Sequence, residues 1–172
     1  MHRKIKARIK ALDREIRALE RESPFTKAAF LNLQNSNVIR TQLEVEFEKS
    51  LRAKEGRKGL VQRLQKVMGE NLTRAQTNAQ TERTRALNGK RYADALREYK
   101  EVLESGTIRI APHFQWVNPL RAKQPRHQHV AISGTVKAVG EEFLPGLRFP
   151  GDPNAPASQV INCHCYIRRV NK

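Results

Sequence analysis

The first hundred residues of the chain repeat apolar positions with the period of an α-helix. Ile5, Ile9, Leu12, Ile16 and Leu19 recur every three or four residues, and arginine and lysine fill many of the positions between them. So narrow an apolar seam predicts a helix that pairs with another helix. The pattern leaves open whether that second helix belongs to this chain or to a partner protein.

Helical patterns continue as far as residue 104. Ser23 and Pro24 are typical of a helix cap and a first turn, so they predict a break and a new helix start. Apolar residues at helical spacing continue over 60–75. Gly89 follows a further helical stretch in a position typical of a C-terminal cap, and a last helix is predicted from about 91 to 104.

After Gly106 the pattern changes to short strands. Residues 107–110, 114–117 and 135–139 are strand candidates separated by proline and glycine, and residues 160–170 form a final β-branched segment. The chain therefore predicts an α+β fold, with a helical N-terminal half followed by a small C-terminal domain that holds a short antiparallel sheet.

Three segments follow from this pattern. Residues 1–58 are predicted to be an N-terminal helical extension, and residues 59–106 to be basic helices that lead into the core. Residues 107–172 are predicted to be a small α+β domain that contains an Asn-Cys-His-Cys motif. At 172 residues, the chain is long enough for a small domain with a modest core and a helical extension.

The charge of the chain favours a polyanionic partner. Lys and Arg number 33 against 17 Asp and Glu, which gives a formal net charge of +16. No apolar run approaches the length that spans a membrane, so we expect no membrane partner. Aromatic residues make up only 6% of the chain, so base stacking on an aromatic platform is not supported.

The positive charge is densest over residues 49–100, which carry a net charge of +9. If the chain binds nucleic acid, we expect this helical region to contact phosphates without reading sequence. The candidate residues for this contact are Arg52, Lys54, Arg57, Lys58, Arg63, Lys66 and Arg74.

The two cysteines offer three chemical interpretations. In a strand, Cys163 and Cys165 would point to one face and His164 to the other. With His113, His127 or His129 nearby, two thiolates and an imidazole could bind zinc. A catalytic cysteine paired with His129 is the second interpretation. The third, which we favour, is that both cysteines are small buried residues, that the Asn162 amide fixes a turn, and that no cofactor is needed.

An ordered set of unusual residues runs through the last third of the chain. Its members are Trp116, Arg126, His129, Gly134, Phe143, the turn at 149–153 and the closing Asn162, Cys163, His164 and Cys165. In this order they resemble the C-terminal domain of the phage Mu F-like minor head proteins, also called phage head morphogenesis proteins. Upstream, Glu82 and Arg85 match a Thr-Glu-x-x-Arg-Ala-like helix of that family, so the resemblance covers roughly residues 75–170.

The chain departs from the family pattern at three positions. The segment between Trp116 and Arg126 has no acidic residue, Ser133 stands where the family often has Asp, and His164 replaces the usual Arg. General acid–base catalysis needs a placed titrating group, so these losses weaken any enzymatic role. We expect a structural role instead, in which Arg126 and His129 hydrogen-bond the backbone of the cysteine strand.

The resemblance implies a virion protein. Minor head proteins of this kind lie inside the capsid beside the portal and act in head assembly and in the handling of packaged DNA during packaging and ejection. The implied partners are the phage portal and major capsid proteins and double-stranded DNA, and the implied location is the virion, after assembly in the host cytoplasm. Two alternatives stay open: a small metal- or cysteine-dependent phage-carried hydrolase, and a basic nucleic-acid-binding module.

Overall fold

The computed structural model of the protein describes residues 2–21, 37–68, 72–106, 110–120 and 122–170. Within these ranges, four helices come first along the chain: α1 (His2–Arg21), α3 (Asn37–Arg52), α4 (Arg57–Met68) and α5 (Leu72–Glu104). Short elements follow: β1 (His113–Val117), α6 (His127–Ala131), β2 (Val136–Ala138), α7 (Ala157–Val160) and β3 (Tyr166–Val170). The protein thus has the α+β fold that the sequence predicts. None of the described helices is both long enough and apolar enough to cross a membrane.

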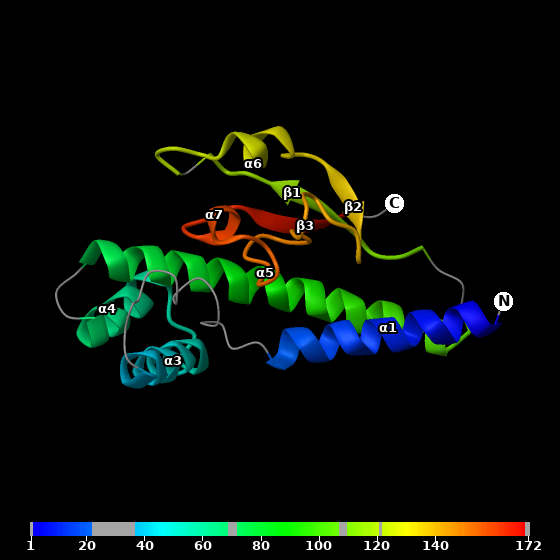
Figure 1. Ribbon diagram of the computed structural model, residues 1–172, viewed down its shortest axis with the longest axis horizontal. Helices are drawn as coiled ribbons and strands as arrows, with labels where there is room; N and C mark the ends of the chain where they lie inside the picture. The colour runs from blue at the N-terminus through cyan, green and yellow to red at the C-terminus, as the bar shows by residue number, and fades with distance from the viewer. Residues whose placement is uncertain (1, 22–36, 69–71, 107–109, 121, 171–172) are drawn as a thin grey trace.

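Helix α5 forms the axis of the molecule (Figure 1). The sheet and the two short helices α6 and α7 lie along one side of α5, and α1, α3 and α4 lie along the other. Helix α1 runs antiparallel to the C-terminal half of α5, and α4 packs against the N-terminal half. Because every layer contacts α5, this helix fixes where the C-terminal elements sit.

The sheet is small and antiparallel, with the strand order β2-β1-β3. Trp116 of β1 pairs with Ile167 of β3, and Phe114 pairs with Lys137 of β2 on the other side. Phe114 and Trp116 are two apart and therefore share one face of the sheet, which is buried. Strand β3 has β1 on one side only, so its other edge must find partners outside the sheet.

Two apolar cores share α5. The larger core joins Leu12 and Ile16 of α1 with Tyr92 and Leu96 of α5 and with side chains of the sheet and its loops. The smaller core joins α3, α4 and the start of α5, and its buried members are Leu43, Phe47, Leu60, Leu64, Ala75 and Ala79. The apolar seam of α1 is therefore covered by a helix of this chain. The division at residues 58 and 106 stays a prediction.

The predicted helix end at Gly89 is wrong. Helix α5 continues through Gly89 to Glu104, which makes it 33 residues long. Gly89 faces the Phe149 ring, and a Cβ atom at this position would lie 3.6 Å from it. Packing along both sides of α5 stabilises the helix, so that it continues past Gly89 although the local pattern assigns this residue to a cap.

The predicted final strand is also shorter than the sequence pattern indicates. Strand β3 begins only at Tyr166, because α7 occupies 157–160 and residues 161–165 are irregular. Asn162 adopts a left-handed conformation with φ of 53°, which a regular strand does not contain. In the predicted first strand Ile110 is irregular, and residues 107–109 lie outside the described part, as do Ser23 and Pro24.

Candidate functional site

The irregular segment 161–165, which we call the cysteine segment, is attached to α5 by hydrogen bonds to its backbone. The Asn162 N–H donates to Thr81 Oγ1 over 2.8 Å. The Cys163 carbonyl accepts from Thr84 Oγ1 at 2.6 Å and from Gln80 Nε2 at 3.0 Å. Backbone groups that have no strand partner are thereby satisfied by side chains of a helix, as burial requires.

The same arrangement continues into β3. Asn88 Nδ2 donates to the Cys165 carbonyl at 3.4 Å, and Asn88 Oδ1 accepts from the Ile167 N–H at 2.9 Å. Arg91 donates to the Ile167 carbonyl at 3.3 Å. The free edge of β3 is therefore covered by polar side chains of α5, which recur at helical spacing along one face.

This row of α5 side chains is the part of the site that sequence reasoning missed. The row consists of Gln80, Thr81, Thr84 and Asn88. None of them is a residue type that suggests catalysis or metal binding, so in the sequence they look like ordinary solvent-exposed polar residues. Yet Thr81, Thr84 and Asn88 are at most 5% exposed. The sequence did hold one signal of this row. Its members are spaced three and four residues apart on a helix whose other polar residues are mostly charged.

Arg126 joins the N-terminal end of α6 to the cysteine segment. Its Nε donates to the Ser158 carbonyl and its Nη2 to the Ile161 carbonyl, each over 2.5 Å. The first carbonyl lies in α7 and the second opens the cysteine segment. The structure thus brings Arg126 to the backbone beside the cysteines, as its sequence position predicts.

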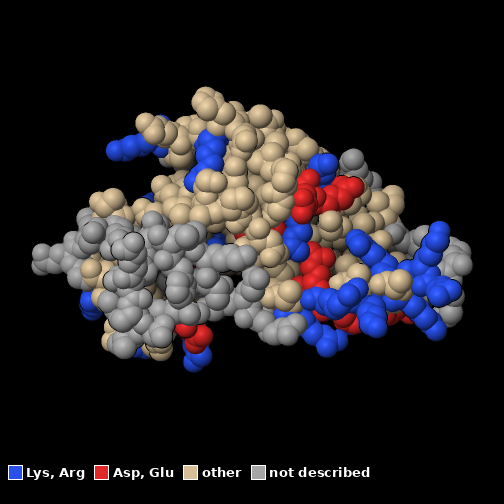
Figure 2. All heavy atoms as spheres, viewed as in Figure 1, with Lys and Arg blue, Asp and Glu red and all other residues tan. Residues whose placement is uncertain are grey.

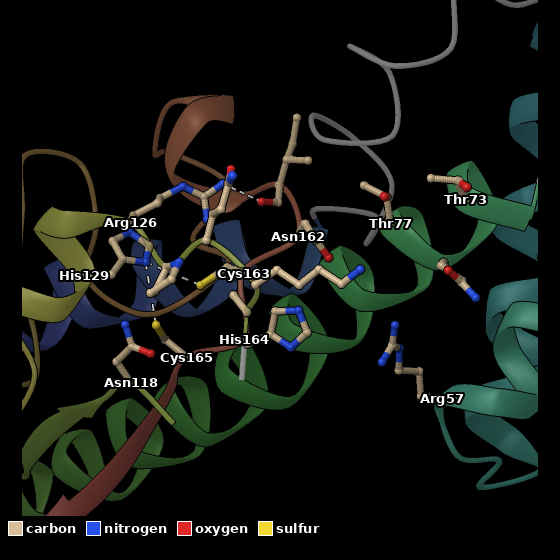
Figure 3. Close-up of a pocket in the computed structure, with 16 residues that line it drawn as sticks. Arg57, Thr73, Thr77, Asn118, Arg126, His129, Asn162, Cys163, His164 and Cys165 are labelled. Atoms are coloured by element: carbon tan, nitrogen blue, oxygen red, sulfur yellow. Dashed lines mark hydrogen bonds between the residues drawn. The ribbon is translucent and has the colours of Figure 1, made fainter. Parts of the chain in front are cut away.

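His129 lies against both thiols in the buried centre of the site (Figure 3). Its Nδ1 is 3.6 Å from Cys163 Sγ and 3.6 Å from Cys165 Sγ. Its Nε2 is 2.9 Å from Gln159 Oε1. The prediction that His129 bonds backbone groups is therefore wrong, because both of its ring nitrogens face side chains. His113 and His127 are not part of this cluster.

The two thiols influence each other's protonation. A hydrogen bond from Cys165 lowers the pKa of Cys163, although burial acts in the opposite direction. The neighbouring Cys163 sulfur and burial raise the pKa of Cys165. The sequence predicted that the two cysteine side chains lie together. Their sulfurs do lie close to each other, although both cysteines stand before β3 and not within a strand.

Trp116 forms one wall of this centre. Its ring meets the His129 imidazole edge-on, with centroids 5.1 Å apart and an interplanar angle of 75°, and it also contacts Phe143. The residue is fully buried, and its indole Nε1 has no hydrogen-bond partner among the described residues.

Two further residues of the resemblance shape the backbone around the centre. Gly134 has a φ of 90°, and its N–H donates to the Trp116 carbonyl at 2.8 Å. This conformation favours glycine. Asn162 turns the chain through its left-handed backbone, which asparagine tolerates better than most residues.

Glu82 and Arg85 lie beneath the turn at 149–153. Both are buried, with the Glu82 side chain fully covered, and Arg85 Nη1 is 3.5 Å from Glu82 Oε2. Arg85 Nε also donates to the Gly151 carbonyl at 3.2 Å. Burial raises the pKa of Glu82 to about 8, although the Arg85 guanidinium acts in the opposite direction. The pair is thus a buried contact beneath the turn.

A pocket of about 740 Å³ opens beside the cysteines and His129. Arg57 of α4, Lys123 and Asn118 line it together with the cysteine segment. Figure 3 shows the His164 ring on the opposite side of the segment from the two sulfur atoms, as the alternating pattern predicts. The described residues that line the pocket include no aspartate and no glutamate.

Apart from Arg74 of α5, the candidate nucleic-acid residues lie on α3, α4 and their connection, and two of these are paired with acids. Arg63 contacts Glu46 at 3.1 Å and Glu55 at 2.7 Å, and Arg52 contacts Glu48. The remaining described candidates, Lys54, Arg57, Lys58 and Lys66, are exposed. The Arg74 side chain lies outside the described part of the chain. The structure does not test whether any of them binds DNA.

Helix α1 presents a second basic surface, which we call the α1 basic face. Figure 2 shows Lys and Arg side chains gathered over this helix. Its exposed members are Arg3, Lys4, Lys6, Arg8, Lys10, Arg14 and Arg17. The acids of α1 instead pair with basic residues of this chain: Asp13 contacts Lys100 at 2.7 Å, and Glu15 contacts Arg148 at 2.5 Å.

Comparison with known proteins gives one limited similarity. Over 55 residues the chain is 38% identical to the uncharacterized protein YqbB of Bacillus subtilis (strain 168). The matched stretch is 29% of this chain and 18% of the relative, so it spans less than a fifth of that protein. No protein-family model and no solved structure matches the chain. Membership of the Mu F-like family therefore stays a prediction.

Proposed function

We propose that the chain is a minor head protein of a tailed phage, located inside the capsid beside the portal, where it acts in head assembly and in the handling of packaged DNA. One observation carries the proposal. The residues of the Mu F-like resemblance, far apart in sequence, meet in one buried unit. Arg126, His129 and Trp116 surround the cysteine segment, while Glu82 and Arg85 support the adjoining turn.

The contacts of this unit favour a scaffold over a hydrolase. Arg126 has its Nε and Nη2 engaged with backbone carbonyls, and His129 is 2% exposed. A hydrolase would need a placed acid or base that reaches substrate, and the described lining of the neighbouring pocket carries no carboxylate. The unit is therefore suited to present a fixed surface to portal or capsid protein.

The α1 basic face suits contact with packaged DNA. Arg3, Lys6, Lys10 and Arg14 recur at helical spacing on the side of α1 that faces away from its apolar seam. They form no ion pair within the described residues, so their charge is available to phosphates. Because α5 covers the seam, α1 would meet a partner through this basic face rather than through its isoleucines.

Head association is the experiment that tests the proposal. Heads from the phage or prophage that encodes the chain are purified from cells with and without the portal gene, and the chain is followed through density gradients. We expect it to sediment with heads that contain portal and to be lost from heads that lack it. Recovery only as a free protein, with normal portal and capsid assembly, would contradict the proposal.

A basic nucleic-acid-binding module is the second candidate, and the α1 basic face supports it. The triple variant Lys6→Gln/Lys10→Gln/Arg14→Gln is compared with Lys54→Gln/Arg57→Gln/Lys58→Gln in binding to random duplex DNA at several salt concentrations. We expect the α1 variant to reduce the salt slope by about two to three and the central variant to reduce it less. Equal loss in both would place DNA on the central helices as well. Tight binding without head association would favour the second candidate.

A further inference from the structure

We propose that Cys163, Cys165 and His129 bind one zinc-class divalent metal ion, with Nδ1 as the imidazole ligand and a fourth position open to the adjoining pocket. The ion would join α6, which carries His129, to the cysteine segment, which carries both sulfurs. It would thereby close the C-terminal unit over α5. This site goes beyond the proposed function, which requires no metal.

The spacing of the three ligand atoms matches a tetrahedral metal. Cys163 Sγ, Cys165 Sγ and His129 Nδ1 all lie within 4.8 Å of one another, and each sulfur is 3.6 Å from Nδ1. With metal–sulfur bonds of about 2.3 Å and metal–nitrogen bonds of about 2.0 Å, a tetrahedral ion separates sulfur from nitrogen by roughly 3.5 Å. The donors therefore need little movement to enclose an ion.

The hydrogen bonds behind His129 select the tautomer that a metal requires. Gln159 Nε2 donates to Gln128 Oε1 at 2.6 Å, which turns Gln159 Oε1 towards the imidazole. Gln159 Oε1 then accepts from His129 Nε2 at 2.9 Å, so Nε2 carries the proton. The lone pair of Nδ1 is left facing the two sulfurs. A metal-bound histidine is usually oriented in this way by an acceptor on its other nitrogen.

The surroundings of the sulfurs suit thiolates. Trp116 Nε1 is buried without a hydrogen-bond partner in the described chain, and the Trp116 ring packs edge-on against the His129 imidazole. A thiolate held by a metal would give this N–H an acceptor. Two thiolates, one neutral imidazole and a divalent ion also sum to no net charge, which lowers the cost of burying the site.

The pocket leaves the fourth position of the metal to solvent. His129 and both cysteines line its wall, so an ion held between them would face the pocket. Arg57 and Lys123 are basic lining residues, and the described lining has no carboxylate that could serve as a fourth ligand. A water molecule or small anion is therefore the expected occupant.

Metal content and cobalt spectroscopy of the full chain test this site. The chain is expressed with added zinc and purified without chelator, and metal is counted by mass spectrometry. We expect about one ion per chain, and cobalt exchange should produce the thiolate charge-transfer and d–d bands of a tetrahedral site. Chelation should also lower the melting temperature. Because these readouts use isolated protein, their failure is distinguishable from failure of head association.

Ligand variants and a matched control complete the test. Cys163→Ser and His129→Ala should each lose most of the bound metal and the cobalt bands. His164→Ala, which removes the imidazole between the two cysteines, should keep both. If a ligand variant fails to fold, the wild-type cobalt spectrum still decides the matter. Folded wild-type protein with two titratable thiols but no metal and no cobalt bands would overturn the site, as would a Cys163–Cys165 disulfide in reducing cytoplasm.

Discussion

Helix α5 holds its neighbours in two different ways along its length. At its start, Ala75 and Ala79 pack with α3 and α4 in an apolar core. Farther along, the side chains of Thr81, Thr84 and Asn88 form hydrogen bonds with specific backbone groups of the cysteine segment and β3. An apolar contact stabilises many related arrangements, whereas hydrogen bonds to specific backbone groups stabilise one register. The difference indicates that the C-terminal unit is held for position as well as for stability.

The largest effect is expected where the turn at 149–153 touches α5. Gly151 has a φ of 84°, and a Cβ atom there would lie 2.6 Å from Arg85 Cα. Gly151→Ala should therefore lower the free energy of unfolding by about 4 kcal/mol or more, measured by denaturant titration. Gly106→Ala is the control, because its φ of 74° carries strain but nothing lies within 4 Å, and it should cost only about 1 kcal/mol. Equal losses would show that the close approach to α5 is unimportant.

The polar row of α5 should be the next most sensitive. Asn88→Ala leaves the Cys165 carbonyl and the Ile167 N–H without their α5 partner, so we expect a loss of about 3 kcal/mol in unfolding free energy. Asn78→Ala is a matched control on the same helix: Asn78 is equally buried at 2% exposure, and its side-chain amide contacts the Met68 sulfur at 3.5 Å. It should cost about 1 kcal/mol. A greater loss at Asn78 would reverse the comparison between the two ends of α5.

The contribution of Glu82, on α5, to the free energy of unfolding should depend on pH. Its pKa is raised from 4.5 to about 8, so between these values the unfolded chain releases a proton that the folded protein retains. Wild-type stability should therefore fall relative to Glu82→Gln as pH rises through this window, by up to a few kcal/mol, and be level outside it.

Thermal unfolding between about pH 3 and pH 9 measures the Glu82 difference. Glu55→Gln is the control of opposite sign, because Arg63 lowers the pKa of Glu55. The stability that Glu55 contributes is present above its ordinary pKa and is lost as pH falls. A Glu82→Gln difference that does not change with pH would mean that the carboxyl is ionised in the folded protein.

The smallest effect is expected at the surface ion pairs of α1. Glu20 contacts Arg97 at 2.6 Å, but the two side chains are 51% and 42% exposed. Glu20→Gln should therefore change the unfolding free energy by less than about 0.5 kcal/mol. Leu12→Ala, in the buried seam of the same helix, should cost about 3 kcal/mol. A large effect at Glu20 would mean that ion pairs, rather than the seam, hold α1 to α5.

The sequence predicted what depends on local periodicity and unusual residue types. The helical half and the antiparallel sheet follow from local patterns. The proximity of His129 to the cysteines was among the alternatives that residue chemistry raised. The predicted helix end at Gly89 and the predicted start of the last strand were wrong, because tertiary packing determines where these two elements end and begin. Thr81, Thr84 and Asn88 were missed, since only the folded structure shows that a strand edge requires partners there.

Hydrogen exchange at two backbone amides tests most directly whether α5 fixes the cysteine segment. The Asn162 N–H bonds to Thr81 and the Ile167 N–H bonds to Asn88, so neither depends on a neighbouring strand. We predict that both exchange as slowly as the amides of β1 in native protein, and that Asn88→Ala accelerates Ile167 more than Asn162. Exchange of both amides as fast as in an exposed loop would contradict the account.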